Sequence, residues 1–367
     1  MKKAFLCVAA ALLLLPAAGR AEARSEILIE AKTGRVLYEY NAHEPLPMAS
    51  TTKIMTALVA LENGHMDEPV TTGENAFGVP GTSIYLSLGE RLRLEDMLLG
   101  LMLASGNDAA VAIAEHIGGS VEDFCRMMTR RAEEIGCENT VFRTPHGLPA
   151  EGHHTTAWDL ALIAREAMKN PKFREIVSTQ RAVLPWSGHE SERILTNKNK
   201  LLSVYPGALG VKTGYTKAAG RCLVFAAERN GLELIGAVLN CPDWFDEAAA
   251  LLDRGFADWQ MVTVLSSGET VRELPVTGGV RDSVKGIVSG DLSAPVPLDA
   301  WPDLVIDLPD SVEAGVVQGQ TIGQVSLVDQ GKTLLTVPVV AAESVPERSF
   351  RAGWTRISLL WLLDGGP

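Results

Sequence analysis

The sequence predicts an α/β (α+β) chain: helices packed on an antiparallel sheet, then a small all-β domain, then a C-terminal amphipathic helix. Three observations lead to this class. Short β-like runs flank a helical middle within the first 260 residues. Beyond residue 260, short β-runs are separated by Gly, Pro and Asp, with no long helical pattern. Near the C-terminus, aromatic residues recur at helical spacing. The length of 367 residues suits about two domains.

Residues 1–23 have the order of a secretory signal. Two lysines at positions 2 and 3 precede an apolar run over 4–18, and Ala21-Glu22-Ala23 suits a cleavage site. The run is shorter than the ~20 residues that a spanning helix needs, although an uncleaved anchor is the alternative. We therefore expect export, with a mature chain that begins near Arg24. The formal net charge of −12 argues against nucleic acid as a partner, because phosphate binding needs basic patches.

The first domain is expected over residues 24–260. Gly34 suits a tight turn between two strands, and Asn230-Gly231 is a strong hairpin signal. Thr155 or Thr156 can cap a helix that follows it. The other expected elements are strands over 25–30 and 35–40, helices that begin at 50, 92, 107, 121 and 155, β-rich segments after 206, and a closing helix over 243–259.

A small all-β domain is expected over residues 261–345, with a role in spacing or docking. The tail, 346–367, carries aromatic and apolar residues at helical spacing with arginines between them. A helix of this kind over 350–363 suits the membrane interface and is too short to span a bilayer. The alternative is a terminal helix docked on the β-domain.

Four cysteines follow the signal segment: Cys125, Cys137, Cys222 and Cys241. Export would permit a disulfide, and their spacing matches no zinc signature. We expect small buried apolar side chains, and the sequence leaves one disulfide open.

Ser50 and Lys53 stand three residues apart where a helix is expected to begin. Side chains at this spacing share one helix face. A serine hydroxyl is a weak nucleophile until a base takes its proton, and a lysine with a lowered pKa can act as that base. Taken alone, the pair favours the alternative, with Ser50 as a helix N-cap and Lys53 as a solvated charge, because S-x-x-K also occurs by chance.

Two further short motifs follow in the chain. Ser105-Gly106-Asn107 lies between two expected helices, where a loop can aim a hydroxyl and an amide into a cleft. Lys212-Thr213-Gly214 lies in an expected strand and offers a cation and a hydroxyl to a substrate carboxylate. The alternatives are an ordinary helix stop and an edge strand protected by a lysine.

The order S-x-x-K, S-x-N, K-T-G is the motif set of the penicillin-recognising serine enzymes, which the chain resembles. "MASTTKIMTAL", "LMLASGNDAA", "TPHGL", "TNKNKLL" and "GVKTGYTKAAGRC" are similar to the D-alanyl-D-alanine carboxypeptidases among the low-molecular-mass penicillin-binding proteins. The resemblance covers roughly residues 25–260. It implies a β-lactamase/transpeptidase-like catalytic domain, an acyl-enzyme mechanism, no cofactor, and peptidoglycan stem peptides ending in D-Ala-D-Ala as substrate. β-Lactam antibiotics would bind covalently.

The resemblance also implies roles for individual residues. Ser50 would be the nucleophile, Lys53 the general base and Ser105 a proton relay. The substrate-binding residues would be Asn107, Lys212, Thr213, Gly214 and Tyr215. Backbone N–H groups of Ser50 and Tyr215 would form the oxyanion hole. The alternatives are a D,D-endopeptidase that cuts cross-linked stem peptides and a cell-wall-binding protein without activity.

One departure from the wider superfamily concerns deacylation. No clear counterpart exists of the glutamate that class A β-lactamases use, and the nearest candidates are Glu151, His153, His154 and Asp159. A metal site at His146, His153 and His154 is a weaker alternative, because no H-E-x-x-H motif is present. We expect no metal.

Overall fold

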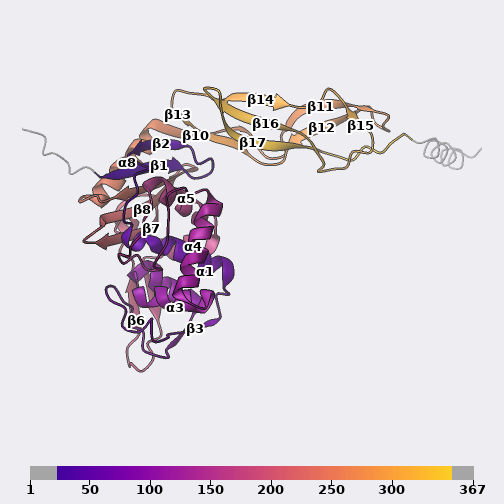
Figure 1. Ribbon diagram of the computed structural model, residues 1–367. Coiled ribbons are helices and arrows are strands. Elements are labelled where there is room, and N and C mark those ends of the chain that lie inside the picture. The colour runs from indigo at the N-terminus through magenta and orange to yellow at the C-terminus, as the bar shows by residue number, and fades with distance from the viewer. Residues whose placement is uncertain (1–22, 349–367) are drawn as a thin grey trace, which may run out of the picture.

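The computed structural model describes residues 23–348. It has two parts, an N-terminal domain of helices and strands and an elongated β-domain that projects from its upper end (Figure 1). The signal segment over 1–22 and the amphipathic helix expected over 350–363 lie outside the described residues. Within 23–348, no helix is long and apolar enough to cross a membrane.

The N-terminal domain is built on a five-stranded antiparallel sheet. Its order is β2 (Val36–Tyr40), β1 (Ser25–Glu30), β9 (Leu232–Leu239), β8 (Gly220–Arg229) and β7 (Ala208–Thr216). The first strand of the described residues therefore pairs with a strand that comes about 200 residues later. The hairpin at Asn230-Gly231 is confirmed, since Arg229 opposes Leu232 and both turn residues have positive φ.

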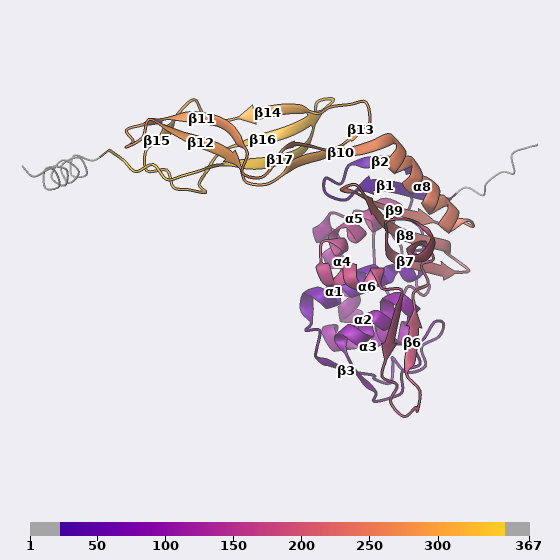
Figure 2. The same ribbon diagram turned by 180° about the vertical axis from the view of Figure 1, so that it is seen from behind.

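Alternation along the strands gives the sheet two buried faces. Ile27, Ile29 and Ile235 lie in the larger core, and Leu28 and Leu234 lie in the smaller one. Helix α5 (Ala157–Met168) covers the first face and α8 (Trp244–Asp258) covers the second. Figure 2 shows the two helices on opposite sides of β9.

The larger core joins the sheet to the helical middle of the domain. The remaining elements of this domain are η1 (Ala49–Thr52), α1 (Lys53–Asn63), β3 (Pro69–Thr71), β4 (Arg91–Arg93), α2 (Leu94–Leu99), the π-helical turn η2 (Gly100–Ala104), α3 (Asn107–Gly118), α4 (Val121–Ile135), α6 (Pro171–Ser178), β5 (Arg181–Leu184), β6 (Arg193–Thr196) and α7 (Leu201–Val204). The Thr156 side chain caps α5 by accepting from Asp159 N, so the second of the two threonine candidates is the cap.

The helix starts expected at residues 92 and 50 differ from the structure for identifiable reasons. The helix expected from residue 92 begins at Leu94, because Arg91–Arg93 pairs with Pro69–Thr71 as a strand. The helix expected from Ser50 begins at Lys53, because residues 49–52 form a 3₁₀ turn. Ala49 opens that turn with a φ of 48°, in the left-handed region that an α-helix excludes.

The β-domain follows α8 directly. Strands β10 (Trp259–Leu265) and β13 (Leu292–Pro297) form a two-stranded ribbon. A six-stranded sheet has the order β14 (Asp303–Asp307), β16 (Thr321–Asp329), β17 (Lys332–Ala341), β12 (Ser283–Val288), β11 (Thr270–Thr277) and β15 (Val312–Glu313). From residue 259 to 348 the structure contains no helix, as the sequence predicts.

Contacts from the turn between β1 and β2 hold the two domains together. Arg35 donates to Pro295 O over 3.0 Å, forms an ion pair with Asp329 and lies 4.6 Å above the Trp259 ring. Lys32 Nζ donates to Asp291 O over 3.1 Å. A half-buried arginine with three kinds of partner restricts how the β-domain can move against the sheet.

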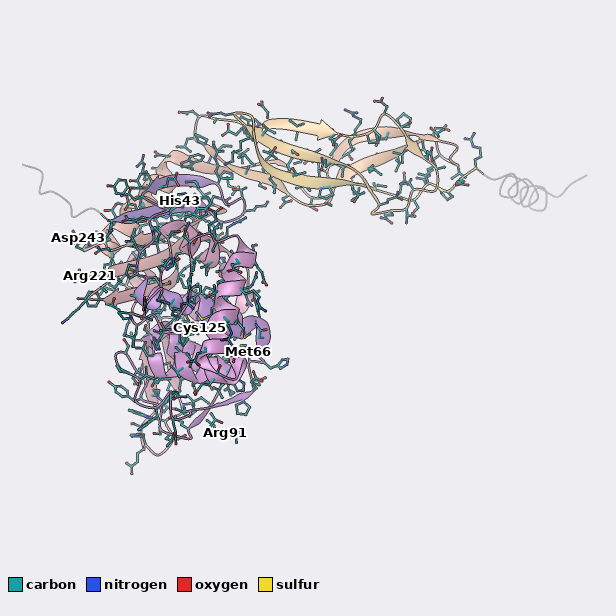
Figure 3. All side chains as sticks on the ribbon, in the orientation of Figure 1. His43, Met66, Arg91, Cys125, Arg221 and Asp243 are labelled. Atoms are coloured by element: carbon teal, nitrogen blue, oxygen red, sulfur yellow. The ribbon has the colours of Figure 1, made fainter. Side chains whose placement is uncertain are left out.

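The four cysteines of the described chain are free and buried. Figure 3 labels Cys125 within the helical part of the N-terminal domain. Burial raises the pKa of the Cys125 and Cys222 thiols to about 11, so both stay protonated at neutral pH.

Candidate active site

Ser50 lies in the 3₁₀ turn η1, between the sheet edge β7 and the start of α1. The chain reaches this position through the left-handed conformation of Ala49. Gly147 packs against the same peptide: a Cβ built on Gly147 would lie 1.8 Å from Ala49 O. Only a glycine fits there, and its φ of 89° also favours glycine.

Lys53 is completely buried behind Ser50, so the alternative of a solvated lysine is wrong. Its Nζ lies 3.1 Å from Ser50 Oγ, 2.8 Å from Asn107 Oδ1 and 2.7 Å from His146 O. Burial lowers the pKa of Lys53 well below its usual value, and the charges of Lys212 and Lys198 lower it further. Asp108 acts in the opposite direction and does not outweigh them.

The contacts of Lys53 determine where the lone pair of its neutral amine points. A neutral amine has two N–H groups and one lone pair, and carbonyl oxygens can only accept. When Lys53 is neutral, its two N–H groups therefore donate to Asn107 Oδ1 and His146 O. The lone pair is left on the side of Ser50 Oγ, where it can take the hydroxyl proton.

Asn107 begins α3, and the loop over 80–84 fixes its side chain. Asn107 Nδ2 donates to Pro80 O over 2.7 Å, which leaves Oδ1 to accept from Lys53. The next residue, Asp108, is buried and accepts from Ile84 N and from Ser83 Oγ, so it ties the loop to the helix.

Ser105 occupies the turn between η2 and α3 with a φ of 66°. It is buried, but its hydroxyl makes no hydrogen bond to another residue within 23–348. The segment Ser105-Gly106-Asn107 therefore both ends η2 and contributes to the site. Asn107 contacts Lys53, whereas the Ser105 side chain has no polar partner within the described residues.

The third motif lies on β7, which is the edge of the sheet as one alternative supposed. Lys212 is nevertheless 1% exposed, and its Nζ donates to Thr213 O over 2.9 Å. Burial, and then the charge of Lys198, lowers the pKa of Lys212 to about 7. Tyr215, by contrast, is 63% exposed.

Gly214 brings this strand against the nucleophile. A Cβ built on Gly214 would lie 2.8 Å from Ser50 N and 3.0 Å from Thr51 N. The absence of a side chain lets the backbone of β7 approach η1 closely. This approach places the N–H groups of Ser50 and Tyr215 on facing segments.

The motifs alone did not reveal the role of two groups in this site. His146 O holds Lys53, and Lys198 adds a charge that lowers the pKa of both buried lysines. The segments "TPHGL" and "TNKNKLL" carry these residues, so the pattern contained a signal for them.

The candidates for a deacylating base differ in exposure and in hydrogen-bond partners. Glu151 is exposed, and Asp159 is buried in the first turn of α5, where it accepts from Thr140 Oγ1 over 2.7 Å. His153 uses both ring nitrogens, toward Arg143 N and Thr52 Oγ1. The described residues contain no group of three or more His, Cys, Asp or Glu side chains that could hold a metal ion.

Comparison with known proteins agrees with this geometry. Residues 15–243 match the family described as D-alanyl-D-alanine carboxypeptidase, and residues 259–347 match the C-terminal domain of penicillin-binding protein 5. The D-alanyl-D-alanine carboxypeptidase DacF of Bacillus subtilis is 35% identical over 340 residues, which cover 90% of this chain and 87% of the relative. DacC of Escherichia coli is 31% identical, with 90% and 86% covered.

A solved structure shows the same two-domain arrangement. Penicillin-binding protein 5 of Haemophilus influenzae superposes with a TM-score of 0.74 at 30% identity, over 89% of this chain and 98% of that one. The transpeptidase-like fold of the first domain and the β-rich second domain are thereby confirmed. The chain belongs to the D-alanyl-D-alanine carboxypeptidase family of low-molecular-mass penicillin-binding proteins.

Proposed function

We propose that this serine-type D-Ala-D-Ala carboxypeptidase acts through an acyl-enzyme on Ser50 and removes the terminal D-alanine from peptidoglycan stem pentapeptides. One observation carries the proposal. A buried lysine with a lowered pKa lies 3.1 Å from the serine hydroxyl, and the other two contacts of its amine are with carbonyl oxygens, Asn107 Oδ1 and His146 O. That arrangement suits a general base and has no evident structural purpose.

In the first half of the reaction, Lys53 takes the proton as Ser50 Oγ attacks the carbonyl carbon between the two D-alanines. The N–H groups of Ser50 and Tyr215 stabilise the negative charge on the carbonyl oxygen. The C–N bond then breaks, and the leaving amine needs a proton, which the protonated Lys53 can supply. Ser105, buried beside Asn107, is the proposed relay for that proton.

Lys212 is proposed to bind the terminal carboxylate, together with the hydroxyl of Thr213. Its pKa of about 7 means that it is partly charged at neutral pH in the free protein. An anionic substrate would raise that pKa, so binding of a free C-terminus and protonation of Lys212 support each other. Water then hydrolyses the Ser50 ester in the second half of the reaction. The same site would also bind β-lactams covalently.

Two experiments test this proposal. Ser50→Ala should abolish covalent labelling by a fluorescent penicillin and leave the fold intact; a stable adduct on the variant would show that another serine is the nucleophile. Residues 24–367 should release D-alanine from a pentapeptide muropeptide and release little monomer from a cross-linked dimer. Rapid dimer cleavage with an intact pentapeptide would instead favour the D,D-endopeptidase.

We further propose that residues 1–23 direct export, that 24–260 form the catalytic domain, and that 261–345 hold it above the outer face of the membrane while 346–367 bind the lipid surface. The apolar residues of 350–363 are the basis of this proposal: burying each contributes about 1.5–3 kcal/mol before ordering costs. Truncation after Val345 should release the protein from anionic vesicles without changing its rate on a soluble peptide. Equal co-sedimentation of both forms would refute the attachment.

A further inference from the structure

The peptide bond between Ala49 and Ser50 has partners at both ends. Its carbonyl oxygen accepts from Thr52 Oγ1 over 2.8 Å. Its nitrogen belongs to Ser50 and lies against Gly214 of β7. A planar trans peptide points its C=O and N–H in opposite directions. Whatever holds Ala49 O therefore also sets the direction of the Ser50 N–H.

The Thr52 hydroxyl has one proton, and Ala49 O receives it. The second contact of that hydroxyl, His153 Nε2 at 3.0 Å, must then be a donor. His153 Nδ1 accepts from Arg143 N over 3.0 Å, so the proton of the neutral ring is on Nε2. Both side chains are buried, with exposed fractions of 1% for Thr52 and 7% for His153. The chain of donors runs in one direction, from Arg143 N to Ala49 O.

The peptide would be poorly placed without this support. Ala49 has a φ of 48°, a conformation that costs a non-glycine residue about 1–2 kcal/mol. On its other side, Gly147 packs so closely that a Cβ there would lie 2.8 Å from Thr52 Oγ1. Residues held in such conformations persist where surrounding contacts determine them, and they cluster at active sites.

We propose that Thr52 and His153 are positioning residues for the reaction at Ser50: the imidazole orients the Thr52 hydroxyl, the hydroxyl holds Ala49 O, and the shared peptide plane aims the Ser50 N–H at the reacting carbonyl oxygen. The inference rests on the proposed acyl-enzyme on Ser50. It assigns to His153 a role that involves neither metal binding nor proton transfer.

The test compares two substrates that differ in one atom. A diacyl-L-Lys-D-Ala-D-lactate ester presents a carbonyl oxygen to the oxyanion hole, and its thionoester presents sulfur, which is larger and a weaker acceptor. Thr52→Val keeps the shape of the side chain and removes the hydroxyl; Thr52→Ser keeps the hydroxyl. We expect Thr52→Val to lower kcat/KM for the ester by about 10- to 100-fold and for the thionoester by less than about threefold. Thr52→Ser should stay close to wild type on both.

His153 offers a matched pair of variants that does not depend on the folding of Thr52→Val. The amide nitrogen of Gln can occupy the position of Nε2 and donate to Thr52, whereas the amide of Asn reaches only the position of Nδ1. His153→Gln should therefore keep the wild-type ratio of ester to thionoester rates, and His153→Asn should reproduce Thr52→Val. Equal losses on both substrates, or no loss, would overturn the inference. A wild-type protein that forms no acyl-enzyme at Ser50 would refute the proposed function itself.

Discussion

Gly214→Ala is the sharpest single test of how close the sheet edge must come to the nucleophile. The new Cβ would lie 2.8 Å from Ser50 N, whereas ordinary contacts begin at 3.4 Å, so β7 must retreat by roughly 0.6 Å. The obstacle is backbone and cannot rotate away. Oxyanion donors act at about 2.7–3.1 Å, and losing one costs about 10²–10³ in rate. A partial displacement should then cost about 10- to 100-fold in acylation.

The assay is the second-order rate of acylation by a fluorescent penicillin, followed by rapid mixing, together with turnover of a depsipeptide ester. Gly290→Ala is the matched control: a Cβ there meets its nearest neighbour, Val337 Cγ1, at 4.0 Å, so rate and stability should stay at wild-type values. Thermal unfolding separates a displaced strand from a misfolded one. A folded Gly214→Ala variant that acylates within twofold of wild type would refute the close approach of β7 to η1.

Four further predictions concern the buried ionisable groups. Lys53→Ala should lower acylation by about 10²–10⁴ or more, the range of a lost general base, and equal rates in rapid mixing would exclude that role. Lys212→Met should raise KM for substrates with a free carboxylate, because the cation that binds them is lost. It should also raise the melting temperature, because it removes an amine whose pKa is lowered to about 7 by burial; a lower melting temperature would contradict this. In wild type, KM for such substrates should rise as pH increases through 7 and stay flat for C-terminally amidated ones, as initial rates would show. Acid should destabilise the fold, because the pKa values of His146 and His153 lie near 3 and 4 when folded and near 6.5 when unfolded. The unfolded chain binds those protons first, so lowering the pH from 7 to 5 should reduce the free energy of unfolding, measured in urea, by about 2 kcal/mol for each histidine. His153→Gln should remove the loss that is due to His153.

The sequence predicted the parts of the fold whose signals are local. Short β-like runs predicted the strands at 25–30 and 35–40, which form β1 and, from Val36, β2, and Asn230-Gly231 predicted the β8–β9 turn. The closing helix expected over 243–259 is α8 (Trp244–Asp258). These segments could be predicted from their own residues, because the spacing of apolar side chains and the turn residues favour the same structure as the tertiary environment.

The turn that carries Ser50 could not be predicted in the same way. A helix pattern runs through residues 50–61, yet the first turn is 3₁₀ and opens on a left-handed Ala49. Gly147 and His153, about 100 residues away in the sequence, impose that geometry from outside. The effect of Lys198 on the pKa of Lys53 could not be predicted either, since the two residues come together only once the chain has folded.

Function in this domain opposes stability at several points around one serine. Two lysines, Lys53 and Lys212, are buried where their charged forms are disfavoured, and this burial lowers the pKa of both amines. Ala49 keeps an unfavourable φ beside them. A site chosen for stability alone would replace the amines by apolar side chains and relax the turn. The surrounding sheet and helices, with their two large apolar cores, hold the arrangement against these costs. Because a neutral amine beside a serine hydroxyl is what proton abstraction requires, the burial that weakens the fold is also what makes Lys53 a base.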